Sequence, residues 1–190
     1  MKNISEMYKK EIVTTSGRVL GTLDGFAVKN DWTVSGLTVK INNDVMADLG
    51  LTKPFLGSLR LDVGVNHVKA MGDNIVLNKS IPDLNGHLTE YHENNNASNI
   101  VKMEIVDSKG RDVGAVEDVI LDDKLWRIPS VLVSVNKEVS EILNVKKPLL
   151  SNSKVSLSTQ HINGAWDKVM LSVTTEHMSE ILEQVPTKPI

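Results

Sequence analysis

The stretch Glu11-Ile-Val-Thr-Thr-Ser-Gly-Arg-Val-Leu-Gly21 occurs a second time in the chain, as Glu104-Ile-Val-Asp-Ser-Lys-Gly-Arg-Asp-Val-Gly114. The two stretches lie 93 positions apart, and Glu, Ile, Val, Gly, Arg and Gly coincide in them. Each has an apolar pair followed by a polar turn, in which the first Gly can adopt a positive φ at no steric cost. The pair indicates a repeated unit that begins with a strand, a turn and a second strand.

The same register continues along the chain after one residue is inserted in the second copy. At the new offset of 94, matched residues include Trp32 with Trp126, Val39 with Val133, Asn42 with Asn136, His67 with His161, Asp73 with Asp167, and Leu88 with Leu182. A single gap over so long a register indicates a duplication. Between the copies lies a polar segment with three consecutive Asn residues and no apolar periodicity, which is typical of a linker. We therefore expect domains at 1–89 and 98–190, joined by a linker at 90–97.

Composition excludes several classes of protein. The chain of 190 residues has no Cys, which removes thiol catalysis, disulfides and Cys-zinc sites. The net charge is −3 and neither half is basic, so a nucleic-acid partner is not expected. No apolar run is long enough to span a bilayer, so we expect no membrane insertion and a cytoplasmic location.

Short strands separated by turns follow in each copy. Residues 19–28 and 32–41 alternate between apolar and polar residues, as half-buried strands do. A short helix is expected at 45–49, capped by Asp44, and at the matching 139–143. A closing helix is expected at 177–185 because its apolar residues share one face. The pattern predicts a mainly β protein with two tandem small antiparallel β-barrels, each with a short helix.

Taken together, these motifs resemble the PRC-barrel domain. The resemblance rests on the repeated Glu-Ile-Val-x-x-x-Gly-Arg-x-x-Gly, on Val116-Glu-Asp-Val-Ile-Leu-Asp122, on the following Val-Leu-Val strand, and on Gly72-Asp-Asn-Ile-Val-Leu77. It covers both copies. The motifs consist of turn glycines and strand alternation, so they indicate the fold more specifically than the function.

Two copies without another domain are similar to archaeal PRC-barrel proteins, some of which, the CdpB group, act in cell division. This resemblance implies a role in division based on FtsZ and its membrane anchor SepF, with SepF or a sister PRC-barrel protein as the partner and a location at the division site. The alternative that the family offers is an RNA- or ribosome-associated assembly factor. The acidic balance of the chain disfavours that alternative.

Few residues are candidates for a metal-binding or catalytic site. His87, Glu90 and His92 form the densest group of metal-ligand types, and on a helix His87 and Glu90 would share a face. The polarity of a linker explains the group better, so no metal or other cofactor is expected. His67 and His161 are matched between the copies, but neither has a second ligand nearby in sequence, which favours a structural or surface role. No catalytic constellation is evident, and we expect a protein that is not an enzyme.

Apolar residues provide the candidates for an interface. Trp32 and Trp126 occupy one repeat position in a chain with three Trp, so each is either a packing residue or an anchor for a partner. The matched pairs Phe55-Leu56 and Leu149-Leu150 present the same choice, and there the composition favours the core. We expect the copies to pack as a pseudo-dimer, with a homodimer as a further possibility, and a partner to bind at a strand edge or groove.

Overall fold

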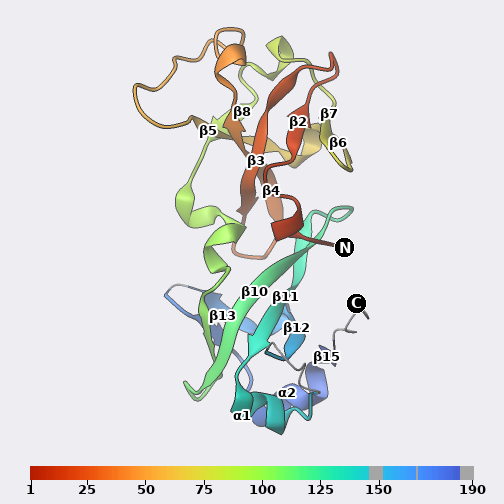
Figure 1. Ribbon diagram of the computed structural model, residues 1–190, viewed down its shortest axis with the longest axis vertical. Coiled ribbons are helices and arrows are strands. Elements are labelled where there is room, and N and C mark those ends of the chain that lie inside the picture. Colours follow the sequence, from red (N-terminus) through yellow and green to blue (C-terminus); the bar gives the residue numbers. More distant parts are fainter. Residues whose placement is uncertain (146–151, 166, 185–190) are drawn as a thin grey trace. The chain divides into compact units, whose positions relative to one another are not determined.

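The computed structural model describes residues 1–145, 152–165 and 167–184 (Figure 1). Contacts divide the chain into two compact units, which are described separately. The N-terminal unit comprises Lys2–Ser98 together with Asp123–Arg127, and the C-terminal unit comprises Met1, Asn99–Asp122 and the described residues from Ile128 onward. Residues 90–97, predicted as a linker, fall within the N-terminal unit. None of the helices in the described part of the chain has the length and apolar character needed to cross a membrane.

The N-terminal unit is built on a seven-stranded sheet. Its strands are ordered β6-β7-β2-β3-β4-β5-β8, and all neighbours are antiparallel except β2 and β7. Their bounds are β2 (Glu11–Val13), β3 (Val19–Val28), β4 (Val34–Ile41), β5 (Arg60–Gly64), β6 (Val68–Met71), β7 (Ile75–Leu77) and β8 (Leu88–Glu90). The two-residue β1 (Lys2–Asn3) precedes them, and 3-10 turns occur at η1 (Ile4–Glu6), η2 (Asn43–Val45), η3 (Val65–His67), η4 (Pro82–Leu84), η5 (Glu93–Asn95) and η6 (Ala97–Ile100).

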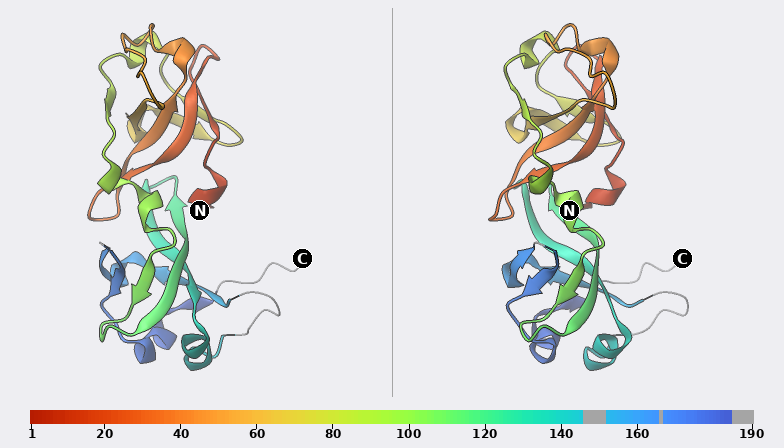
Figure 2. Two further views of the ribbon diagram at one scale, coloured as in Figure 1. Left: turned by 60° about the vertical axis from the view of Figure 1, so that its left-hand side comes forward. Right: turned by 90° about the vertical axis from the view of Figure 1, so that its left-hand side faces the viewer.

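The C-terminal unit has strands in the equivalent order, β13-β14-β9-β10-β11-β12-β15. Their bounds are β9 (Glu104–Val106), β10 (Asp112–Asp122), β11 (Arg127–Val135), β12 (Lys154–Ser158), β13 (Ile162–Ala165), β14 (Val169–Leu171) and β15 (Glu183–Gln184). The parallel pair of β14 with β9 matches that of β7 with β2. Helices α1 (Lys137–Ile142) and α2 (Thr175–Ile181) lie side by side at one end of this unit, and η7 (Thr159–His161) precedes β13 (Figures 1 and 2). The prediction of a mainly β protein is confirmed.

Backbone geometry repeats at matched positions of the two units. Left-handed φ angles occur at Lys9 (66°) and Lys102 (72°), at Trp32 (65°) and Trp126 (51°), and at Gly50 (67°) and Asn144 (52°). Lys9 N–H donates to the Leu23 carbonyl at 2.8 Å, and Lys102 N–H donates to the Val116 carbonyl at 2.7 Å. L-residues seldom adopt this conformation, so its recurrence at the sequence offsets of 93 and 94 is specific to the shared architecture.

The predicted helices are confirmed in part. The Asn136 side chain accepts a hydrogen bond from Val139 N–H at 2.9 Å and caps α1, whereas the matching Asn42 caps nothing and the first copy forms only the 3-10 turn η2. The closing helix begins earlier than predicted, at Thr175, and ends at Ile181, because Leu182 is extended and the next two residues form β15. The bounds expected for that helix were therefore wrong.

Each unit has its own core. Large side chains such as Phe26, Leu37 and Ile75 are completely buried in the N-terminal unit, and Ile105, Val131 and Leu157 are completely buried in the other. β11 shows the expected period of two, because every second residue from Val131 to Val135 is buried. β4 departs from that period because four consecutive residues, from Gly36 to Val39, are buried.

Candidate functional site

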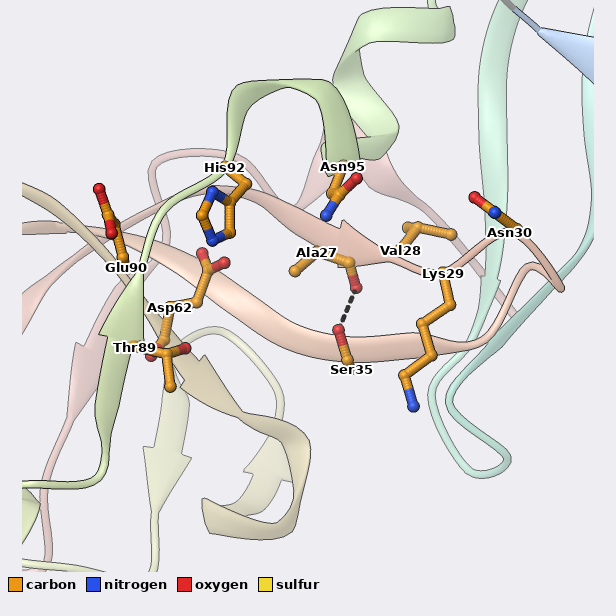
Figure 3. Close-up of a pocket in the computed structure, with 10 residues that line it drawn as sticks. All are labelled: Ala27, Val28, Lys29, Asn30, Ser35, Asp62, Thr89, Glu90, His92 and Asn95. Carbon is orange, nitrogen blue, oxygen red and sulfur yellow. Dashed lines mark hydrogen bonds between the residues drawn. The ribbon is translucent and has the colours of Figure 1, made fainter.

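A cleft of about 490 Å³ opens in the N-terminal unit where five elements meet. Its walls come from the end of β3, the start of β4, the middle of β5, the end of β8 and the η5 turn (Figure 3). The lining residues are Ala27, Val28, Lys29, Asn30, Ser35, Asp62, Thr89, Glu90, His92 and Asn95. Most of them are polar, and a volume of this size lies within the range of small-ligand and side-chain pockets.

Asp62 is the one buried carboxylate among the lining residues, and 8% of its surface is exposed. Thr38 on β4 donates its hydroxyl to Asp62 Oδ1 at 2.7 Å, because the two residues are directly paired across β4 and β5. Burial raises the pKa of Asp62, while this hydrogen bond and the charge of His92 oppose the rise, and the net pKa lies above the ordinary value. Figure 3 shows the Asp62 carboxylate and the His92 ring facing each other.

One wall of the cleft is held in place by Asn96. This side chain is buried and packs on Gly25 in β3, so closely that a Cβ at Gly25 would lie 2.0 Å from Asn96 Nδ2. Asn96 Oδ1 accepts hydrogen bonds from the Ser98 N–H at 2.9 Å and from the Ser98 hydroxyl at 2.8 Å. Ala27 and Asn96 also form a backbone bridge. The Asn-rich segment is therefore part of the N-terminal unit and covers the sheet beside Asp62.

The three residues singled out as metal ligands do not come together. Glu90 and His92 line the cleft, but His87 contacts His67, with ring centroids 5.0 Å apart and planes at 73°. The expected shared helix face is wrong because residues 88–90 form strand β8. Within the described residues, no group of three or more His, Cys, Asp or Glu could hold a metal ion. Burial, and then the charges of His87 and Lys79, lower the pKa of His67.

The two matched Trp residues occupy hairpin turns. Trp32 N–H donates to the Lys29 carbonyl at 3.0 Å, and Lys29 N–H donates to the Thr33 carbonyl at 2.9 Å, which defines a three-residue loop with Trp32 at its left-handed position. Trp126 has the same conformation between β10 and β11. Both side chains are half-buried, so neither is a fully buried core residue.

Phe55 and Leu56 are the most exposed large apolar residues in the described part of the chain, at 98% and 82%. They lie on the segment between η2 and β5, after Pro54 and before Gly57, which has a φ of 81°. The interpretation as core is wrong for this pair, because the segment turns away from the sheet. The matching Leu149 and Leu150 lie outside the described residues.

An ion-pair network in the C-terminal unit surrounds the buried Asp107, and its contact with the distant helix α2 has no signal in residue spacing that would have revealed it. Asp107 Oδ2 accepts hydrogen bonds from Arg111 Nη2 at 2.7 Å and Arg111 Nε at 2.9 Å, and from the hydroxyl and N–H of Thr175 at 2.9 and 3.0 Å. The same guanidinium binds Glu176 on α2. Burial would raise the pKa of Asp107, but hydrogen bonds from Thr175 and Arg111 outweigh it, and the pKa lies far below its ordinary value.

The comparison with protein families identifies the class of the C-terminal unit. A PRC-barrel domain is found at residues 92–176, which include every strand from β9 to β14 and the start of α2. The match confirms the predicted resemblance for the second copy. A search of curated proteins finds no significant match to the chain.

Proposed function

We propose that the chain is a non-enzymatic interaction adaptor made of two PRC-barrel units, with residues 1–89 as a diverged copy of the matched domain. The equal strand order of the two sheets and the repeated left-handed positions support a common origin. Two copies in one chain would replace the two subunits of a dimer, since covalent linkage raises the effective concentration of one copy near the other.

The exposure of Phe55 and Leu56 is the observation that carries the adaptor role. Both side chains stand almost wholly in solvent on a segment of the N-terminal unit. Burying a large apolar side chain against a partner contributes about 1.5–3 kcal/mol, and aromatic residues are frequent anchors of interfaces. Two such side chains in succession form a compact apolar patch that a partner with a complementary pocket can bind.

The PRC-barrel resemblance sets the cellular context of this proposal. We place the protein in the cytoplasm at the division site of an archaeal cell, where it links FtsZ-based division machinery through SepF or another PRC-barrel protein. The partner provides an apolar pocket for Phe55 and Leu56. The cleft at Asp62 lies on the same unit and offers a second point of contact.

Affinity purification from the native cell tests the proposal. The tagged protein is expected to enrich SepF or a second PRC-barrel protein, and the double variant F55S/L56S is expected to lose at least tenfold of that enrichment. The control is M170S, which alters a side chain that is 41% exposed in the C-terminal unit and is expected to keep the partner. Circular dichroism melting verifies that all three proteins are folded.

Two results would refute the proposal. Recovery of ribosomal proteins in place of division proteins would support an assembly factor instead. Equal enrichment by the wild type and the double variant would show that the exposed pair is not the anchor.

A further inference from the structure

We propose that the Asp62 cleft binds the guanidinium group of an arginine side chain from the partner protein. The proposal rests on the adaptor function, because the partner supplies the arginine. It identifies the chemistry of a second contact, separate from the apolar pair at Phe55 and Leu56.

The argument begins with the buried carboxylate. Asp62 is more than nine-tenths buried, and its carboxylate accepts a hydrogen bond from Thr38 at Oδ1. Figure 3 shows the carboxylate directed toward the His92 ring, which also lines the cleft. No ion pair of the described residues includes Asp62. His92 is the cationic neighbour that acts on this carboxylate. Because His92 is exposed and Asp62 is buried, a second cation inside the cleft would offset more of the cost of taking the carboxylate out of water.

The remaining walls favour a cation over an anion. Glu90 adds a second carboxylate to the lining, and Thr89 and Asn95 add neutral oxygen atoms. Lys29 also lines the cleft, but its ammonium group is directed away from Asp62 (Figure 3). A small metal cation is disfavoured because the described residues contain no group of three suitable ligands.

Guanidinium fits this set of acceptors better than ammonium. It is planar and has five N–H donors in a fixed fork, so one edge of the fork can bind Asp62 while the remaining donors bind neutral oxygen atoms of the lining, such as the hydroxyl of Thr89, which is paired with Asp62 across β5 and β8. The cleft volume of about 490 Å³ accommodates a long side chain together with water. His92, which faces Asp62, is exposed and can move aside when the guanidinium enters.

The second unit provides an internal comparison. In the register of the two copies Asp62 corresponds to Ser156, and Thr38 corresponds to Leu132. These residues are paired across β11 and β12, as Thr38 and Asp62 are across β4 and β5. The carboxylate and its hydroxyl donor are therefore present in one unit and absent from the same place in the other. This difference assigns the arginine site to the N-terminal unit alone.

Nuclear magnetic resonance of the full chain tests the proposal with two matched probes. N-acetyl-arginine amide is expected to shift the Asp62 carboxyl signal and the neighbouring Thr89 and His92 signals, and to lower the measured pKa of Asp62. N-acetyl-citrulline amide has nearly the same shape without the charge and is expected to produce no such shifts. A single charged contact of this kind corresponds to a Kd in the range of about 1–10 mM.

Two variants define the site. D62N is expected to weaken binding of the arginine probe at least tenfold, and D73N, which alters an exposed carboxylate of the same unit, is expected to bind normally. The proposal is overturned if citrulline amide shifts the Asp62 signal equally, if D62N binds as the wild type does, or if Asp62 does not respond at about 50 mM arginine amide. Urea unfolding of both variants shows whether the N-terminal unit is intact.

The two experiments distinguish failure of the arginine site from failure of the proposed adaptor function. If F55S/L56S loses the partner but Asp62 does not respond to arginine amide, the adaptor stands and the arginine site fails. If Asp62 binds arginine amide but no division protein is enriched from cells, the site stands and the division adaptor fails.

Discussion

The substitution Asp107→Asn is expected to destabilise the C-terminal unit strongly. Asp107 Oδ2 accepts four hydrogen bonds, two from Arg111 and two from Thr175. Its Oδ1 accepts two more, from the N–H groups of Lys109 at 2.9 Å and Arg111 at 3.0 Å. Asparagine keeps the second set, but its NH₂ group faces the donors of the first set and cannot accept from them. The turn between β9 and β10 thereby loses its connection to the first turn of α2.

The magnitude follows from the burial of each group. Removing one partner of a buried ion pair costs about 3–5 kcal/mol, and a hydrogen bond to a charged group contributes about 1.5–3 kcal/mol. The Arg111 side chain is 41% exposed, so water can replace part of the hydrogen bonding that it loses. Thr175 is buried, so its N–H stays unpaired after the substitution. We expect a decrease of about 2–4 kcal/mol in the free energy of unfolding. For a domain of this size the decrease lowers Tm by roughly 10 °C or more.

Acid is expected to remove the same contribution. The guanidinium of Arg111 lowers the pKa of Glu176 to about 2 from 4.5, and the pKa of Asp107 lies far below 3.8. Since both pKa values are depressed in the folded state, the unfolded state binds more protons at low pH. The contribution is complete above about pH 4.5 and decreases as the pH falls below that value. Asp107→Asn is expected to abolish the part of this acid dependence that comes from Asp107, while the pair of Arg111 and Glu176 keeps its own part.

Urea unfolding followed by resolved amide signals measures each unit separately. The N-terminal signals serve as the internal reference, because the substitution is in the other unit. Thr14→Ala is the matched control: Thr14 occupies the equivalent position and its hydroxyl donates to the Arg18 carbonyl at 3.0 Å, so we expect a loss of about 1 kcal/mol. A change below about 0.5 kcal/mol in Asp107→Asn, or one no larger than that of Thr14→Ala, would refute the reasoning.

Further predictions concern the N-terminal unit. Gly21→Ala is expected to cost about 3 kcal/mol, because its Cβ would lie 2.1 Å from the Lys40 carbonyl oxygen, a backbone atom that cannot easily move. Gly17→Ala meets open space and is expected to cost about 1 kcal/mol, from its φ of +78° alone, and urea unfolding of both variants compares them. Because the pKa of His67 is lowered from 6.5, first by burial and also by His87, the unfolded state binds more protons and the unit is expected to lose stability as the pH falls below about 6.5. His87→Gln is expected to reduce that slope, and an unchanged slope in pH-dependent unfolding would contradict the assignment.

Strand alternation and turn glycines were sufficient to predict a mainly β chain with a repeated unit, because period two and positive-φ turns are local properties. The bounds of α2 were less accurate, because the chain after Ile181 pairs with β12, a contact that local patterns do not contain. Whether an apolar pair is buried or exposed could not be predicted from the sequence either. Phe55 and Leu56 have the composition of core residues, and only the course of the segment around Pro54 leaves them in solvent.

The sequence by itself determined that two similar β units make up the chain, that the second resembles a PRC-barrel, and that neither half is strongly basic. The tertiary structure alone decided which polar residues act together. Asp62 meets His92 because β5 and the η5 turn converge beside β3, and Asp107 meets Thr175 because the β9–β10 turn lies against the start of α2. In each case the chain between the two residues is long, and contacts at such separation follow from strand order and not from spacing along the sequence.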